Sequence, residues 1–372
     1  MRDAQRKGLK QTLERLEHRI ARTLVGGAGR LPAWLQRYGR EVDGARLHPE
    51  VQLLLALMEL RGADSALRAD TPASSRARMR REARVHAGLV TPVGAVRDLS
   101  FQGPGGALRA RLYSPERAPG KERPPLLLFF HGGGFVSGDL DTHDPPCRTL
   151  CRALDAAVLS VEYRLAPEHP FPAAVEDACA ALRFARESAH ELGADPRRIG
   201  VAGDSAGGNL ATVATQLAAR AGEPLPVMQL LLYPTVDSTS EWPSLGLFSK
   251  GFFLTHADIL WCRAHYSAGH DLSDPRISPL LATNLAELPP ALIVTACFDP
   301  LRDEGEAYAE AIAKAGGQVD MVRIPGLIHG FINLGSLSRA SHAALLHIAE
   351  RAHDLLWYPR ALGLTSPVEL QA

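Results

Sequence analysis

Short apolar runs alternate with amphipathic stretches from about residue 95 onward, and they predict alternating strands and helices. Strands are predicted to begin at 95–101, and the run at 107–113 alternates apolar with polar positions, which is typical of a half-buried strand. Six later runs predict buried strands, at 126–130, 157–161, 199–202, 228–233, 291–295 and 318–324. Helical spacing occurs near 147–153, 173–190, 208–220 and 341–356. This alternation predicts an α/β protein whose mostly parallel central sheet is flanked by helices.

Two regions depart from this alternation, and both are predicted to contribute to a helical cap. Residues 1–90 contain helical patterns and no strong strand signal, so they are interpreted as an N-terminal helical region. The stretch 236–280 is rich in aromatic residues and is interpreted as a cap insertion. The core then comprises 91–235 and 281–360, and 361–372 form a C-terminal tail.

A glycine-flanked serine stands where one buried strand is predicted to turn into a helix. The pentapeptide Gly-Asp-Ser-Ala-Gly occupies 203–207. Glycines two positions before and after Ser205 let strand and helix pass close together, with the hydroxyl exposed at the sheet edge. A plain turn with a serine cap is the alternative interpretation. The remaining motifs favour a nucleophile.

Three consecutive glycines follow the strand at 126–130, after His131. Glycines at a strand end expose backbone N–H groups that can face a developing negative charge. We expect an oxyanion hole formed by the N–H groups of Gly133, Gly134 and Ala206. A phosphate-binding loop is the alternative, but neither the Gly-Lys-Ser/Thr sequence nor a complete dinucleotide fingerprint is present.

A serine nucleophile needs a base, and a carboxylate must orient that base. The expected chain order after a nucleophile elbow is serine, acid, histidine. His329 directly follows the last predicted strand, and Asp299 follows the strand before it. We therefore predict Ser205, Asp299 and His329 as the catalytic residues. Asp303 is the nearest rival acid.

These motifs together resemble the hormone-sensitive-lipase-like family of α/β-hydrolase serine esterases, in its bacterial branch of Gly-Asp-Ser-Ala-Gly type. The resemblance rests on 131–134, 203–207, 299–305 and 329–331, and on 163–173, a stretch that supports the oxyanion loop in that family. It extends from about 95 to 357. It implies a serine carboxylesterase that acts on short- to medium-chain acyl esters, with a cap drawn from the N-terminus and the insertion.

The substrate pocket of such an enzyme is lined partly by the cap. Aromatic residues in and around the cap are the candidates for that lining. We predict Trp34, Phe248, Phe252 and Phe331 as pocket residues.

Composition limits the partners. The 41 basic and 41 acidic residues balance, so no overall field favours nucleic acid or an acidic membrane. The arginines between 76 and 84 are interpreted as a solvated helix face. Neither a signal peptide nor an apolar run long enough to span a membrane is apparent. Five cysteines, an odd number, suggest reduced thiols in the cytoplasm.

The expected partner is therefore a small-molecule ester, and a homodimer is left open. No cofactor or metal is expected, because the cluster of His270, Asp271 and Asp274 lacks ligand spacing. Two other functions remain as alternatives to the carboxylesterase. One is an amidase or deacetylase that uses the same three residues. The other is a non-catalytic protein that keeps the fold to bind a ligand.

Overall fold

The computed structural model describes residue 23 and residues 39–359, apart from 61, 63, 64, 87, 89 and 119. Trp34, the first of the predicted pocket residues, lies outside the described residues. So do nearly all of 1–38 and the predicted tail at 361–372.

An eight-stranded sheet runs through the molecule in the order β10-β9-β8-β7-β5-β6-β4-β3. The strands from β10 to β6 are parallel, and β4 and β3 continue the sheet antiparallel. Their bounds are β3 Ala95–Gly103, β4 Gly106–Ser114, β5 Leu126–Phe130, β6 Ala157–Glu162, β7 Ile199–Asp204, β8 Gln229–Leu232, β9 Ala291–Phe298 and β10 Val319–Ile328. The predicted α/β class, with its mostly parallel sheet, is confirmed.

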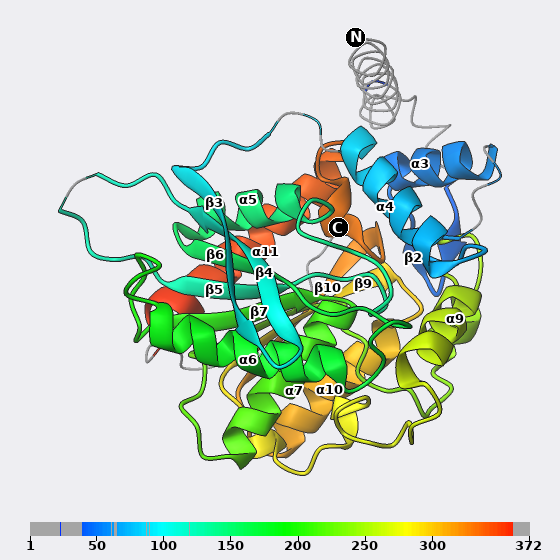
Figure 1. The fold of residues 1–372 in the computed structure, drawn as a ribbon. Coiled ribbons are helices and arrows are strands. Elements are labelled where there is room, and N and C mark those ends of the chain that lie inside the picture. The colour runs from blue at the N-terminus through cyan, green and yellow to red at the C-terminus, as the bar shows by residue number, and fades with distance from the viewer. Residues whose placement is uncertain are drawn as a thin grey trace, which may run out of the picture.

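Helices cover both faces of the sheet, as Figure 1 shows. Successive residues of β5 point to opposite faces, so Leu126 and Leu128 pack in one core cluster and Leu127 and Phe129 in the other. Helices α6, α7 and α10 cover the first face, and α5 and α11 cover the second. Their bounds are α5 Asp144–Leu154, α6 Ala173–Ser188, α7 Ala206–Arg220, α10 Arg302–Lys314 and α11 Arg339–Trp357. Both faces of the parallel strands are therefore buried, which explains their continuous apolar runs.

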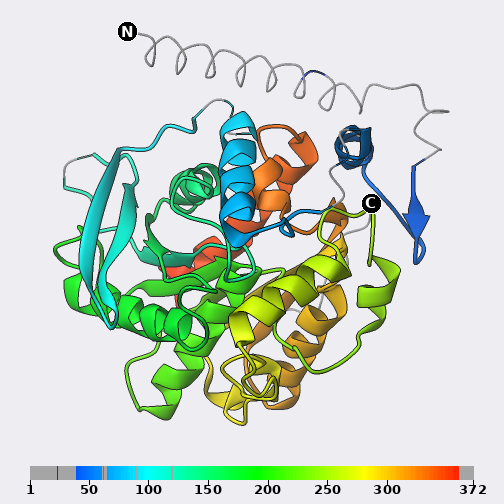
Figure 2. The same ribbon diagram turned by 45° about the vertical axis from the view of Figure 1, so that its right-hand side comes forward.

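The remaining elements connect or flank this core. In Figure 2 the β3–β4 hairpin forms one edge of the molecule, and α3 with the β1–β2 pair lies at the opposite edge. The bounds are β1 Glu41–Val42, β2 Ala45–Arg46, α3 Pro49–Leu60, α4 Pro72–His86, α8 Pro243–Leu247, α9 His256–Ser267, and the 3₁₀ turns η2 Pro279–Leu281, η3 Leu285–Glu287 and η4 Phe331–Leu334.

One feature of this region differs from the prediction. The N-terminal region was expected to be helical, but β1 and β2 form a two-stranded antiparallel pair within it. Each strand is two residues long, which is too short for alternation to be visible in the sequence. Among the described residues, no helix combines the length and apolar character required to cross a membrane.

Candidate active site

The turn between β7 and α7 holds Ser205 in a conformation that side chains seldom adopt. Its φ is 54° and its ψ is −119°. The two flanking glycines make this turn possible, because a Cβ on Gly203 would overlap the backbone of Gly207. A Cβ on Gly207 would overlap the carbonyl group of Phe130. The serine is thus held where strand and helix meet, at the carboxyl edge of the sheet.

His329 connects Ser205 to Asp299 through two hydrogen bonds. His329 Nδ1 lies 2.7 Å from Asp299 Oδ2, and Nε2 lies 3.0 Å from Ser205 Oγ. A carboxylate oxygen can only accept, so the proton sits on Nδ1 and Nε2 accepts from the serine hydroxyl. All three side chains are buried or nearly so. The arrangement can move a proton from the serine to the imidazole.

The two candidate acids point in different directions. Asp299 directly follows β9, and its Oδ1 accepts from the Leu301 N–H at 2.8 Å, which fixes the carboxylate. Asp303 lies within α10, and its Oδ2 accepts from the Ser244 N–H at 2.8 Å. Asp303 therefore anchors α8, while Asp299 faces the histidine.

The glycine loop after β5 passes beside Ser205. Gly133 and Gly134 have φ values of 122° and 63°, which favour glycine. Within the described part of the chain, the structure records no hydrogen bond from the backbone N–H groups of Gly133, Gly134 or Ala206 to another residue. The Ala206 N–H is also the first of helix α7, where the helix dipole favours negative charge. These amides are free to receive an oxyanion.

Asp204 joins the glycine loop to the turn that carries Ser205. Its Oδ1 accepts from the Gly132 N–H at 2.8 Å and lies 3.3 Å from His143 Nε2. Burial by itself raises the pKa of Asp204, but His143 and the Gly132 N–H more than offset this, so the pKa lies below its ordinary value. The ionised carboxylate therefore ties together the two segments that supply the free amides.

The glycine loop rests on the segment that follows β6. The Tyr163 hydroxyl donates to the carbonyl of His131 at 2.7 Å, and its ring stacks on the His131 ring at 4.3 Å. The Ala166 N–H donates to the carbonyl of Phe135 at 2.9 Å. Burial, followed by the nearby His143, lowers the pKa of His131 to about 4, so this ring is neutral near pH 7. The stretch 163–173 thus supports the loop, as the resemblance implies.

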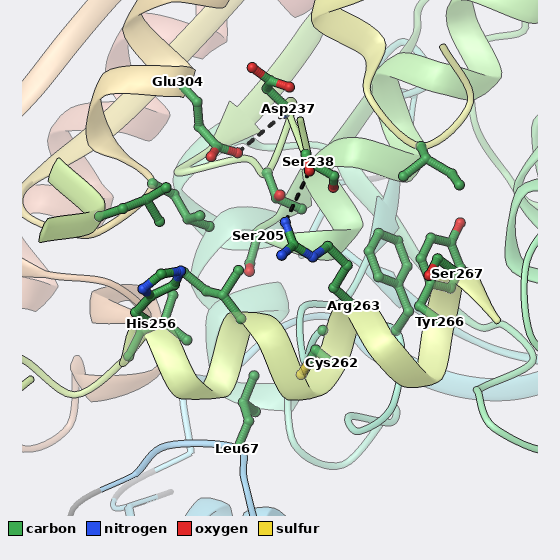
Figure 3. A pocket seen from close by; sticks show the side chains of 18 of the residues that line it. Leu67, Ser205, Asp237, Ser238, His256, Cys262, Arg263, Tyr266, Ser267 and Glu304 are labelled. Carbon is green, nitrogen blue, oxygen red and sulfur yellow. Dashed lines mark hydrogen bonds between the residues drawn. The ribbon is translucent and has the colours of Figure 1, made fainter. Parts of the chain in front are cut away.

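Two cavities meet at Ser205, and each has about 800 Å³ of empty space including its open mouth. The α9 cavity, shown in Figure 3, is lined by α9 and by the segment after β8. The α4 cavity is lined by α4 and by His329. Leu67, Ser205 and Leu254 line both. Apolar side chains with a few polar groups among them, as in both cavities, are typical of sites for small organic ligands.

Three of the four predicted pocket residues were predicted incorrectly, and the fourth, Trp34, lies outside the described residues. Phe248, Phe252 and Phe331 are buried in the core and line neither cavity. Phe248 and Phe252 pack against Phe298, and Phe331 packs edge-on against Tyr233. An aromatic residue gains most by burial in a packed core, and composition alone does not separate that role from a pocket wall. The aromatic rings at the α9 cavity are instead those of Phe135 and Tyr266.

Two further polar residues near the site were missed by the sequence reasoning. His143 lies next to Asp204 and has no motif of its own to mark it. Arg76 belongs to the arginine-rich helix that was predicted to be solvated, but it donates to the carbonyls of Val136 and Ala166, both at 2.7 Å. It thereby attaches α4 to the glycine loop. Each of these two residues is at least 60 positions from the partner cited for it, Val136 for Arg76 and Asp204 for His143, so no local sequence pattern could reveal the contact.

A parallel sheet that presents a serine, a histidine and a carboxylate at its carboxyl edge defines the α/β-hydrolase class. A profile of the alpha/beta hydrolase fold matches residues 127–333. The carboxylic ester hydrolase LipN of Mycobacterium tuberculosis is 50% identical over 321 residues, which cover 84% of each chain. The ethyl acetate hydrolase of Pseudomonas putida is 36% identical over 310 residues, 82% of this chain and 98% of that protein.

Solved structures agree with these relatives. An ester hydrolase from the Lake Arreo metagenome has a TM-score of 0.79 at 41% identity, covering 82% of this chain and 98% of that one. The carboxylesterase EstE1, cloned from a metagenomic library, has a TM-score of 0.74 at 43% identity, covering 77% and 98%. The chain therefore belongs to the hormone-sensitive-lipase-like family of α/β-hydrolase esterases.

Proposed function

We propose that this protein hydrolyses short- to medium-chain acyl esters through an acyl-enzyme on Ser205. It is a carboxylic ester hydrolase, the activity named for relatives that are 36% and 50% identical to it. The observation that carries the mechanism is the hydrogen-bonded chain from Ser205 through His329 to Asp299, beside free backbone amides. These are the parts that acyl transfer to a serine requires.

The reaction follows from this arrangement in two halves. Ser205 Oγ attacks the ester carbonyl carbon while His329 Nε2 takes its proton, and the carbonyl oxygen becomes an oxyanion held by the N–H groups of Gly133, Gly134 and Ala206. The bond to the alcohol oxygen then breaks, and the imidazolium returns the proton to the departing alcohol. Water, deprotonated by His329, attacks the acyl-enzyme and releases the acid and the free serine.

The two cavities divide the substrate. The general acid must reach the leaving oxygen, so the alcohol lies in the α4 cavity, which His329 lines. The acyl chain then lies in the α9 cavity, between Phe135 and the apolar side chains of Ile259 and Leu254.

The test is the hydrolysis of p-nitrophenyl butyrate by purified protein. The Ser205→Ala variant should keep the fold, judged by circular dichroism, and lose nearly all turnover. Ser188→Ala, at the end of α6, is the matched serine control and should retain the wild-type rate. Substantial turnover by Ser205→Ala would refute the assignment of the nucleophile.

The same assays separate the two other functions. An amidase or deacetylase would hydrolyse an anilide faster than the ester of the same acid, whereas we expect the ester to be preferred. A ligand receptor that merely keeps the fold would turn over neither compound.

Location and assembly complete the proposal. We place the protein in the cytoplasm because all five cysteines are free thiols and four of them are buried. The partner is a small-molecule ester, without nucleic acid. Association into a homodimer stays a prediction that light scattering of the purified protein can test.

A further inference from the structure

A short segment of the N-terminal region, residues 65–68, is held by one carboxylate of helix α9. We call this segment the strap. Asp258 Oδ1 accepts from the Ser65 hydroxyl and from the N–H groups of Leu67 at 3.1 Å and Arg68 at 2.6 Å. Asp258 Oδ2 accepts from the Ala66 N–H at 3.3 Å. The carboxylate is fully buried, so these hydrogen bonds are shielded from water.

The carbonyl group of Leu67 in the strap is also hydrogen-bonded, by a side chain of helix α4. The Ser75 hydroxyl donates to the Leu67 carbonyl at 2.6 Å and lies 2.8 Å from the Ser137 hydroxyl. The Ser137 N–H in turn donates to the carbonyl of Gly133 at 2.9 Å. Both backbone groups of Leu67 are therefore held, one by α9 and one by a serine pair that leads to the glycine loop.

The Leu67 side chain lies where the two cavities meet. It lines the α9 cavity and the α4 cavity, as Ser205 does. A Cβ built on Gly134 would lie 3.4 Å from Leu67 Cδ1 and would overlap the Cys262 thiol. Figure 3 shows Leu67 reaching the pocket from the N-terminal segment, close to Cys262 of α9. Leu67 therefore packs against the glycine loop and borders both cavities that reach Ser205.

We propose that Leu67, with Leu254, forms a wall shared by the acyl and alcohol sides of the site, and that Asp258 is the positioning residue that keeps Leu67 there. This inference rests on the proposed function, which assigns one cavity to each half of the ester. A side chain that lines both cavities limits the size of the acyl group and of the alcohol at the same time. Ile259 lines only the α9 cavity and Met79 only the α4 cavity, so each of these limits one half.

Two substrate series test the shared wall. The acyl series consists of p-nitrophenyl esters from acetate to decanoate, and the alcohol series consists of butyrates of alcohols from ethanol to naphthol. Leu67→Ala should raise kcat/KM for octanoate relative to butyrate about tenfold, and for naphthyl relative to ethyl butyrate by a similar factor. Leu67→Phe should lower both ratios. Ile259→Ala should shift only the acyl ratio, and Met79→Ala only the alcohol ratio.

A second set of variants tests the role of Asp258. Asp258→Asn, or the milder Ser65→Ala, should release the strap and shift both ratios in the direction of Leu67→Ala. Asp320→Asn is the matched control, because Asp320 pairs with Arg351 and lines neither cavity. It should lower the melting temperature and leave both ratios unchanged. The double variant Asp258→Asn with Leu67→Ala should shift the ratios no further than Leu67→Ala alone.

The possible results separate the inference from the proposed function. If the wild-type protein hydrolyses no ester of either series, the proposed function fails. If the wild type is active and Leu67→Ala changes one ratio or neither, Leu67 is not a shared wall. Additive shifts in the double variant would show that Asp258 does not act through Leu67. Leu260→Ala, at an exposed position of α9, should match the wild type in every assay.

Discussion

The direction of a single carboxylate decides which nitrogen of His329 carries the proton. Asp299 accepts from His329 Nδ1 with one oxygen and from the Leu301 N–H with the other. The second bond keeps the carboxylate from turning away. At this position the charge of the acid stabilises the imidazolium that forms during the reaction.

Replacing Asp299 by Asn should therefore preserve the fold and remove most of the activity. The amide can present an N–H to the ring and favour the wrong tautomer. We expect kcat for p-nitrophenyl butyrate to fall about 10³-fold or more, with a much smaller change in KM. Steady-state kinetics measure both values. A loss of less than tenfold would mean that another group orients the histidine.

A second residue, Glu304 beside the α9 cavity, makes the stability of the protein depend on pH. Burial raises its pKa to about 8, although its Oε1 accepts from the Val236 N–H at 2.8 Å. Between its ordinary pKa of 4.5 and about 8 only the unfolded state loses the proton, so this residue lowers stability as pH rises.

Glu304→Gln keeps an acceptor for the Val236 N–H and does not ionise. The free energy of unfolding of the wild type, relative to this variant, should fall by about 3 kcal/mol between pH 5 and pH 8. Urea denaturation of both proteins at the two pH values measures this difference. A constant or rising difference would contradict the buried, protonated state.

Sequence reasoning reached some of these residues and not others, for physical reasons. Ser205, Asp299 and His329 stand directly after predicted strands, and the structure brings them within hydrogen-bond distance; their catalytic roles stay predictions until assayed. The prediction of Phe248 and Phe252 as pocket residues is wrong, because an aromatic residue has no local signal that separates a pocket from a core. Their contacts with Phe298, edge-on for Phe248 and stacked for Phe252, exist only in the folded chain.

At the scale of elements, the β7–α7 turn depends on the absence of side chains. Gly207→Ala should lower the free energy of unfolding by about 3 kcal/mol or more, because its Cβ would overlap the backbone at Phe130. Gly246→Ala is the matched control: no atom lies within 4 Å of its Cβ position, and it lies in helix α8. That change should be neutral or slightly stabilising. Chemical denaturation compares the two variants. Equal stabilities would contradict the close approach.

The strands that are buried on both faces were predicted from the sequence. The strands of the sheet were predicted because burial on both faces requires continuous apolar runs, such as Leu126–Phe130. The β1–β2 pair was missed because two residues per strand carry no period. The strap at 65–68 has no regular structure, and its position depends on a carboxylate about 190 positions away.

At the scale of the whole molecule, some contacts contribute to stability without touching the site. Trp357, at the end of α11, is nearly buried, and its indole N–H donates to the Leu154 carbonyl at 2.8 Å. The guanidinium groups of Arg117 and Arg198 lie over its ring. It lines neither cavity at Ser205.

Trp357→Ala should therefore destabilise the protein without changing its specificity. The loss of a buried aromatic side chain costs about 3–5 kcal/mol of unfolding free energy. We expect KM for p-nitrophenyl butyrate, measured well below the new melting temperature, to stay within twofold of the wild type. A large change in KM would mean that this end of the sheet is coupled to the site.

The arrangement of the outer elements around the site is the part that sequence patterns alone could not supply. Whether a segment belongs to a cap depends on contacts such as that between Asp258 and Leu67, which no local period encodes. The apolar pattern in the sequence predicts the layers of the core, because apolar positions are those buried between the sheet and its helices. The polar contacts that shape the cavities become visible only once those layers are assembled.

Covalent labelling tests the central claim most directly. The wild-type protein is incubated with an alkyl fluorophosphonate, and its intact mass and peptide masses are measured together with the remaining p-nitrophenyl butyrate hydrolysis. We predict one adduct per chain, located on Ser205, whose formation parallels the loss of activity, and no adduct on Ser205→Ala. An active protein that gains no adduct, or that is inactivated through another residue, would contradict the account.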